Sequence, residues 1–263
     1  MTDNYQDNLK VQQDYYNNTA DKYDGWHVDV PSALVVNQWN LDNLKKFLGE
    51  QKITKCLDLG CGSGRLSADL LKLSAEVYGL DASEALLAIA TKKYPELKLT
   101  LGEVTKLPYE DNFFDLVVVN GAFHHFFALK ETCIEIERVL KPAGVLAVLG
   151  EPNKNYNPRN IFWYGFIAYM VWRKILSLVS RRHSTEVIEP DAEAFEPLKM
   201  KKVLSDSGLQ VEKFYTYDYG PRLNNNFWLK HYHRILKLEH KTLAKWAPLK
   251  GSAIQTFCRK KQA

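Results

Sequence analysis

The residues best suited to chemistry in this sequence form a glycine cluster with acids beside it. Gly60, Gly62 and Gly64 alternate with other residues in the run Leu57-Asp-Leu-Gly-Cys-Gly-Ser-Gly64. Glycine lets a backbone turn tightly and approach a ligand closely. The cluster lies between an apolar run and a helical pattern, and the N–H groups at the start of a helix attract anions. This arrangement predicts a ligand-binding turn.

Two acids indicate which ligand the turn binds. Asp81 follows the next apolar run, about 20 residues after Gly60, where nucleotide-binding folds place an acid on the ribose hydroxyls. Asp58 would repel a pyrophosphate and attract an ammonium group. The third glycine of the dinucleotide fingerprint would fall at position 65, which is Arg65. We therefore expect a ligand with a ribose, a positive group and no pyrophosphate, which S-adenosylmethionine satisfies.

Apolar runs typical of strands alternate with helical patterns around this turn. The expected strands are 53–59, 76–80, 98–101, 114–119, 145–149, 211–217 and 252–259. The expected helices are 8–24, 32–48, 65–73, 83–94, 130–140, about 157–180 and 198–207. Residues 141–144 are expected to form a turn and 151–158 a loop. Such alternation predicts an α/β fold with a doubly wound, mostly parallel sheet.

A resemblance to a known family rests on four segments, which read LDLGCGSG, YGLDAS, LGEVTKLPYEDNFFDLVVVNGAFHHF and ERVLKPAGVLAV. They resemble class I S-adenosylmethionine-dependent methyltransferases, in the small-molecule subgroup related to ubiquinone-biosynthesis methyltransferases. The resemblance covers residues 10–150 well and the later core loosely. It implies a Rossmann-like, seven-stranded sheet whose last strand is antiparallel.

The same resemblance divides the chain into four parts. Residues 1–49 would form a helical cover, and 50–150 the cofactor-binding core. Residues 151–194 would form an amphipathic helical insertion, or lid, after the fifth strand. Residues 195–263 would complete the core sheet around an aromatic, basic insertion at 218–250 after the sixth strand.

The resemblance also assigns the methionine end of the cofactor site. Asp58, Gly60 and Gly62 would line it, and Cys61 lies among them. Asn120, just past the fourth strand, would contact the methionine portion.

The adenosine end follows in the same way. Asp81 would bind both ribose hydroxyls, and Ala82 would pack against the adenine. Glu103 and Val104 match a segment that usually reads Asp-Ala, and they would hydrogen-bond the adenine. Tyr16 or Tyr23, from the N-terminal cover, would touch the cofactor carboxylate; the alternative is that both tyrosines pack their helix onto the sheet.

Methyl transfer from a sulfonium group needs few catalytic groups. The methyl group, the sulfur and the nucleophile must be in line, and a base is needed only if the nucleophile is protonated. His124 and His125 follow the fourth strand and are the candidate bases, although a structural role is the alternative. Further residues are candidates for the substrate pocket: Glu151, Trp163, Phe166, Tyr217 and His231.

Residues 161–172 are apolar and aromatic, and basic residues follow up to 182. Twelve helical residues span about 18 Å, which is short of a bilayer core of about 30 Å. We expect a lid over a hydrophobic substrate. The alternatives are peripheral membrane contact through 161–182 and a homodimer surface.

Composition excludes several classes of protein. The chain has 263 residues, of which 46% are hydrophobic and 25% charged, as is usual for a globular protein. Its four cysteines form no CxxC pair, so we expect no metal site and a reducing compartment. The polar N-terminus resembles no signal peptide, which favours the cytoplasm, with peripheral membrane contact as the alternative.

These observations favour an enzyme that transfers a methyl group to oxygen or nitrogen, less readily to carbon, of a small hydrophobic or amphiphilic molecule. The net charge of +4 conceals an acidic first part and a basic second part. No RNA-binding motif accompanies the basic residues, so we expect no nucleic-acid partner. The alternatives are an RNA-modifying methyltransferase and a non-catalytic protein that binds S-adenosylmethionine.

Overall fold

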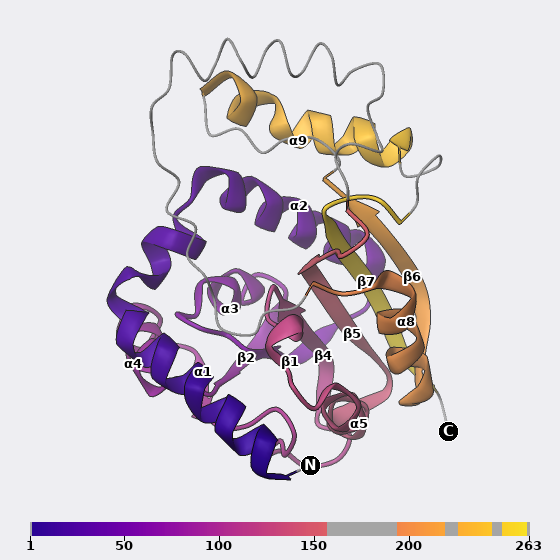
Figure 1. The fold of residues 1–263 in the computed structure, drawn as a ribbon. Helices are drawn as coiled ribbons and strands as arrows, with labels where there is room; N and C mark the ends of the chain where they lie inside the picture. The colour runs from indigo at the N-terminus through magenta and orange to yellow at the C-terminus, as the bar shows by residue number, and fades with distance from the viewer. Residues whose placement is uncertain (1, 157–193, 219–225, 244–248, 262–263) are drawn as a thin grey trace.

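One mixed sheet organises the molecule (Figure 1). The structure is a computed structural model that describes residues 2–156, 194–218, 226–243 and 249–261. In these residues the sheet has seven strands in the order β3-β2-β1-β4-β5-β7-β6. The strands are β1 (Ile53–Leu59), β2 (Ser74–Asp81), β3 (Lys98–Leu101), β4 (Phe114–Asn120), β5 (Leu140–Pro152), β6 (Leu209–Tyr217) and β7 (Ala253–Lys260). The strand β7 is antiparallel to β5 and β6, and the other pairs are parallel, which confirms the predicted fold class.

The helices lie close to where the sequence predicts them. Their bounds are α1 (Thr2–Tyr23), α2 (Pro31–Leu48), α3 (Arg65–Leu70), α4 (Glu84–Lys93), α5 (Leu129–Val139), α8 (Pro197–Asp206) and α9 (Asn226–Lys241). The π-helical turn η1 (Asp24–Val28) and the 3₁₀ turn η2 (Phe123–His125) are shorter. Local sequence explains two of the starts. Pro31 occupies the first turn of α2, and the Ser83 hydroxyl accepts a hydrogen bond from the Leu86 N–H at the start of α4.

The two faces of the sheet are covered by different helices. Successive strand side chains point to opposite faces, so neighbours in β1 belong to different clusters. Leu57 packs in one cluster with Ile136 of α5 and Leu204 of α8. Cys56 packs in the other with Leu44 of α2, on the face that α3 also covers. Burial on both faces explains why the strands read as nearly continuous apolar runs.

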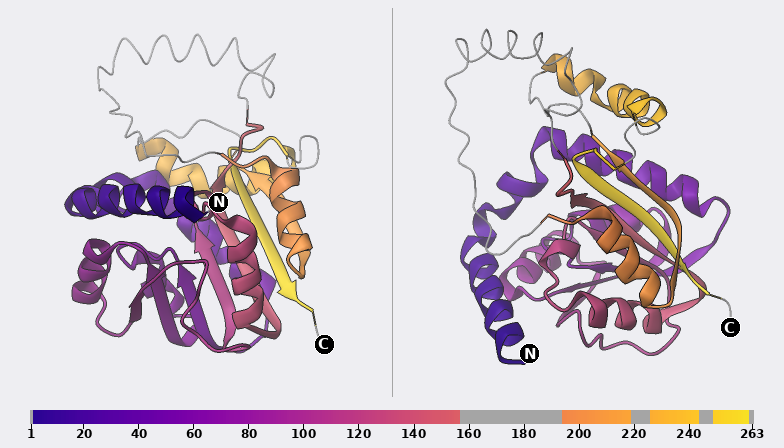
Figure 2. Two further views of the ribbon diagram at one scale, coloured as in Figure 1. Left: turned by 60° about the horizontal axis from the view of Figure 1, so that its bottom comes forward. Right: turned by 45° about the vertical axis from the view of Figure 1, so that its right-hand side comes forward.

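Helix α9 lies within residues 218–250, where the resemblance implies a helical or aromatic insertion without fixing the bounds of a helix. The helix lies alongside α2 (Figure 1). Its Tyr232 and Leu236, one turn apart, pack against Val36 and Trp39 of α2. The two further views show α1 and α2 on the same side of the molecule, above one edge of the sheet (Figure 2).

Strand β5 differs from the prediction at both ends. The expected turn at 141–144 lies inside the strand, where the register with β4 shifts between Phe114 and Leu116 and Ala143 has a φ of 63°. A bulge thus replaces the turn. The expected loop after residue 150 is also wrong at its start, because β5 continues to Pro152 and pairs there with β7.

The helix expected from 157 to 180, including Trp163 and Phe166, lies outside the described residues. Among the helices that the structure describes, none has the length and apolar character needed to cross a membrane.

Candidate active site

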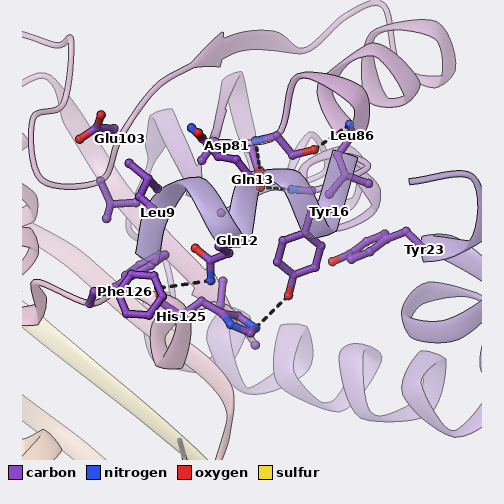
Figure 3. A pocket seen from close by; sticks show the side chains of 18 of the residues that line it. Leu9, Gln12, Gln13, Tyr16, Tyr23, Asp81, Leu86, Glu103, His125 and Phe126 are labelled. Atoms are coloured by element: carbon purple, nitrogen blue, oxygen red, sulfur yellow. Dashed lines mark hydrogen bonds between the residues drawn. The ribbon is translucent and has the colours of Figure 1, made fainter. Parts of the chain in front are cut away.

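Two adjoining cavities lie at the carboxyl ends of the parallel strands, beneath α1 and α2. The residues that follow β2, β3 and β4 line the first cavity together with one face of α1, as Figure 3 shows. The glycine turn, η1 and the first half of α2 line the second. The cavities share a wall formed by Tyr16, Tyr23, Gly60, Asn120, Gly121 and His125.

The glycine turn has little space for side chains. Gly60 and Gly62 have φ angles of 77° and 52°, which favour glycine. A Cβ atom at Gly60 would lie 2.7 Å from the Cβ of Ala122. One at Gly62 would lie 3.1 Å from the hydroxyl of Tyr23. The turn is therefore pressed between the loop after β4 and the N-terminal cover, as a turn close to a ligand should be.

Asp81 lies in the wall of the first cavity and fixes the shape of the glycine turn. Its Oδ2 accepts a hydrogen bond from the Gly62 N–H at 2.8 Å, and its Oδ1 accepts one from the Ser83 N–H at 2.9 Å. Burial raises the pKa of this carboxyl group. Glu103 and Val104, predicted to lie beside the adenine, line the same cavity.

Asp58 lies in the second cavity and is almost completely buried. Its Oδ2 accepts a hydrogen bond from the Ser67 hydroxyl at 2.6 Å. Burial raises the pKa of Asp58 to about 7, and the nearby charge of Asp81 adds to the effect. A cationic group beside this carboxylate would offset the cost of its burial.

The residues fit S-adenosylmethionine in chemistry and in space. Asp81 offers a carboxylate to the ribose, and Asp58 offers one to the ammonium group. Gly121, between the two cavities, has a φ of 60°, and a Cβ atom there would meet no atom within 4 Å. Open space therefore lies beside Gly121, on the wall that the two cavities share.

Glu151 lies beneath the second cavity and does not line either cavity. It is fully buried, and its carboxylate accepts hydrogen bonds from three successive backbone N–H groups, at residues 122, 123 and 124. The His124 Nδ1 lies 2.8 Å from its Oε2. The predicted pocket residue thus holds the loop after β4 and one of the two histidines. The sequence did not indicate this contact between the histidine and the carboxylate, because the two residues lie 27 positions apart.

The two histidines lie side by side, with ring centroids 4.0 Å apart. His124 lines the second cavity, and His125 lines both. The His125 Nε2 lies 3.1 Å from the hydroxyl of Tyr16, as Figure 3 shows. Tyr16, one of the two tyrosines expected to reach the cofactor carboxylate, lines both cavities.

The N-terminal cover is fastened at two further points that sequence reasoning missed. The side-chain oxygen of Asn17 accepts hydrogen bonds from the Ser83 hydroxyl at 2.8 Å and the Ala85 N–H at 3.1 Å. Asp24 of η1 binds the Ser63 hydroxyl in the glycine turn and the Lys93 ammonium of α4. In sequence these polar residues look like an exposed helical face, so no local signal distinguishes them.

Two other predicted pocket residues are not among the described residues that line either cavity, although the Tyr217 hydroxyl would lie 3.8 Å from a Cβ atom at Gly150, in the wall of the second. Tyr217 is fully buried and packs with Trp39 and Tyr232. Its position at the end of β6 explains this burial, because α2 and α9 cover that end. His231 lies on α9.

Solved structures with this architecture define the class of fold. The chain is similar to an S-adenosylmethionine-dependent methyltransferase from Thermotoga maritima, with a TM-score of 0.61 and 16% identity over 95% of this chain and 100% of that one. A second such enzyme, from Aquifex aeolicus, has a TM-score of 0.56 and 16% identity over 91% and 97% of the two chains.

Sequence comparisons identify the family. Residues 57–148 match the family described as "Methyltransferase domain". A demethylmenaquinone methyltransferase from Chlorobaculum parvum is 31% identical over 70% of this chain and 78% of its own. One from Staphylococcus aureus is 32% identical over 57% and 63%. The chain belongs to the class I S-adenosylmethionine-dependent methyltransferases, with relatives among the enzymes of quinone biosynthesis. S-adenosylmethionine is its cofactor.

Proposed function

We propose that this enzyme methylates a hydroxylated aromatic ring of a hydrophobic acceptor, of the quinol class. The observation that carries the proposal is the contact between His124 and the buried Glu151 at the wall of the second cavity. The names of the sequence relatives, which act on demethylmenaquinone, support the choice of acceptor.

The two cavities bind different parts of the cofactor, and the second also takes the acceptor. Asp81, Ala82, Glu103 and Val104 hold the adenosine end in the first cavity. Asp58, Gly60, Cys61, Gly62 and Asn120 hold the methionine end, and Tyr23 closes over it. When bound, S-adenosylmethionine supplies an electrophilic methyl group whose leaving group departs neutral. The acceptor enters the remainder of the second cavity, beside His124.

His124 then acts as the base. Three backbone N–H groups fix the Glu151 carboxylate as an acceptor, so it also accepts from His124 Nδ1. The proton lies on Nδ1, and Nε2 is the basic nitrogen of the ring. It takes the proton of a ring hydroxyl, which makes that oxygen and the neighbouring ring carbon nucleophilic. We propose transfer to oxygen, and Glu151 is the positioning residue for the base.

The test uses deuterated S-adenosylmethionine with 1,4-dihydroxynaphthalene, an aromatic amine and a short RNA as acceptors. The diol should gain one labelled methyl group, and NMR of the product separates oxygen from carbon transfer. A labelled RNA would favour an RNA-modifying enzyme. Tight binding of S-adenosylhomocysteine without any product would favour a non-catalytic protein.

Two variants test the roles of the pair. His124→Gln should lower kcat about 100-fold or more, because a positioned base contributes that much. Glu151→Gln should lower kcat by about 10-fold or more, with KM and the Kd of S-adenosylhomocysteine little changed. His231→Gln, on α9 and outside both cavities, is the matched control. Full kcat in both site variants would contradict the proposed base.

A further inference from the structure

Three asparagine side chains form a chain of amides between α2 and the end of β4. The Asn40 Nδ2 donates a hydrogen bond to the Asn120 Oδ1, and the Asn120 Nδ2 donates one to the Asn37 Oδ1. Each N···O distance is 3.4 Å, near the upper limit for a hydrogen bond. All three residues line the second cavity. We call them the amide chain.

The amide chain begins with an unsatisfied oxygen. Asn40 is only 1% exposed, and its Oδ1 has no hydrogen-bond partner in the part of the chain that the structure describes. A buried acceptor without a donor is costly, and native proteins rarely keep one without a reason. Because the bond from Nδ2 is long, a small rotation of the Asn40 amide toward the cavity costs little.

Gly150 leaves space for these amides at the end of β5. It has a φ of 72°, and it also lines the second cavity. A Cβ atom there would lie 3.4 Å from the Asn120 Oδ1 and 3.5 Å from the Asn40 Nδ2. A larger residue would therefore press against the amide chain from the cavity side.

We propose that Asn40 is a polar subsite for the acceptor, in which its Oδ1 accepts a hydrogen bond from a second hydroxyl group. Asn120, which lines both cavities, joins this subsite to the methionine end of the cofactor site. This inference rests on the proposed function for the identity of the acceptor. A diol would thus meet His124 with one hydroxyl and Asn40 with the other. Asn40 is then a specificity-determining residue that lies outside the glycine turn.

A hydroxyl group of the acceptor fits better than the ammonium group of the cofactor. The buried carboxylate of Asp58, at the end of β1, already matches a cation. The amide chain lies between α2 and the end of β4, the strand next to β1. Neutral amides suit a neutral hydroxyl, whereas a cation would favour the carboxylate.

The experiment removes one partner at a time. It compares 1,4-dihydroxynaphthalene with 4-methoxy-1-naphthol, in which one hydroxyl is blocked, by calorimetric binding to the enzyme loaded with S-adenosylhomocysteine. Wild type should bind the diol about 10-fold more tightly, as one hydrogen bond predicts. Asn40→Ala and the nearly isosteric Asn40→Leu should reduce this preference to less than about 2-fold.

Asn43→Ala is the matched control. Asn43 lies one turn along α2, donates to the Gln255 side chain at 3.2 Å and lines neither cavity. The Asn43→Ala variant should keep the full wild-type preference for the diol over 4-methoxy-1-naphthol. The thermal midpoint of Asn40→Leu should fall only slightly, because the one side-chain hydrogen bond that it removes, from Nδ2 to Asn120 Oδ1, is long at 3.4 Å and the Oδ1 has no partner in the described residues.

The outcomes separate the two proposals. An equal preference in wild type and both Asn40 variants would overturn the subsite. Weaker binding of S-adenosylhomocysteine in those variants would also overturn it and assign Asn40 to the cofactor. Preserved discrimination in binding, without methylation of the diol, would contradict the proposed function and leave the subsite standing. Failure of wild type to bind either compound would overturn both.

Discussion

At the scale of single residues, the charge of Asp58 depends on what binds beside it. Burial raises the pKa of this carboxyl group from an ordinary value near 4 to about 7. The folded chain therefore holds the proton more firmly than the unfolded chain. This contribution to stability is complete below the unfolded pKa and is lost as the pH rises through about 7. Between these values Asp58 releases its proton to solvent when a cation binds beside it.

We predict that S-adenosylhomocysteine binds wild type roughly 10-fold more weakly at pH 6 than at pH 8, because the carboxylate must be ionised to meet the ammonium group. Calorimetry in buffers with different ionisation enthalpies should show proton release on binding near pH 6. Asp58→Asn should bind weakly at both values. An unchanged pH dependence in this variant would assign the effect to another group.

At the scale of elements, Asp24 fastens the N-terminal cover over the cofactor site. It binds the glycine turn through Ser63 and α4 through Lys93, so η1 is tied to two parts of the core. The side chain of Lys93 is about half exposed, and such ion pairs contribute little to stability. We therefore propose that this contact serves to close the cover rather than to stabilise the fold.

We predict that Asp24→Ala speeds dissociation of S-adenosylhomocysteine about 10-fold, as measured by stopped-flow displacement, with a loss of about 1 kcal/mol or less in unfolding free energy. Asp21→Ala, an exposed acid just before η1, is the control and should dissociate like wild type. Equal dissociation rates in the three proteins would show that the cover does not limit release.

The elements also show what the sequence can and cannot predict. Strands such as Ile53–Leu59 and Phe114–Asn120 lie where apolar runs place them, because burial on both faces leaves a local signal. The bounds of helix α9 were not predicted. Its Tyr232 and Leu236 have helical spacing, but the aromatic and basic residues around them hide where the helix begins and ends. The Asn40–Asn120 contact joins residues 80 positions apart, and no local pattern encodes it.

At the scale of the whole molecule, charge and apolar surface are unevenly distributed along the chain. Basic residues predominate after residue 150, and the apolar run 161–172 precedes Arg173 and Lys174. These residues lie outside the described part of the structure, so their role rests on sequence. A hydrophobic acceptor dissolved in lipid would make contact with an anionic surface useful.

We predict that the enzyme co-sediments with anionic vesicles and less with neutral ones, because basic residues beside an apolar segment favour anionic lipid. Trp163→Ala and Arg173→Glu should each weaken this association several-fold. Lys10→Glu, on α1, is the charge-matched control. Unchanged sedimentation of the first two variants would instead favour the lid, or a homodimer surface that analytical ultracentrifugation would reveal.

The place of β7 in the sheet has a consequence for how the chain is made. This strand is synthesised after the other six, yet it lies between β5 and β6 and pairs with both. While the ribosome is still translating residues 253–260, β5 and β6 each have an edge without its neighbour. Such edges are sites of aggregation, so a nascent chain stalled before this point would be a natural substrate for chaperones.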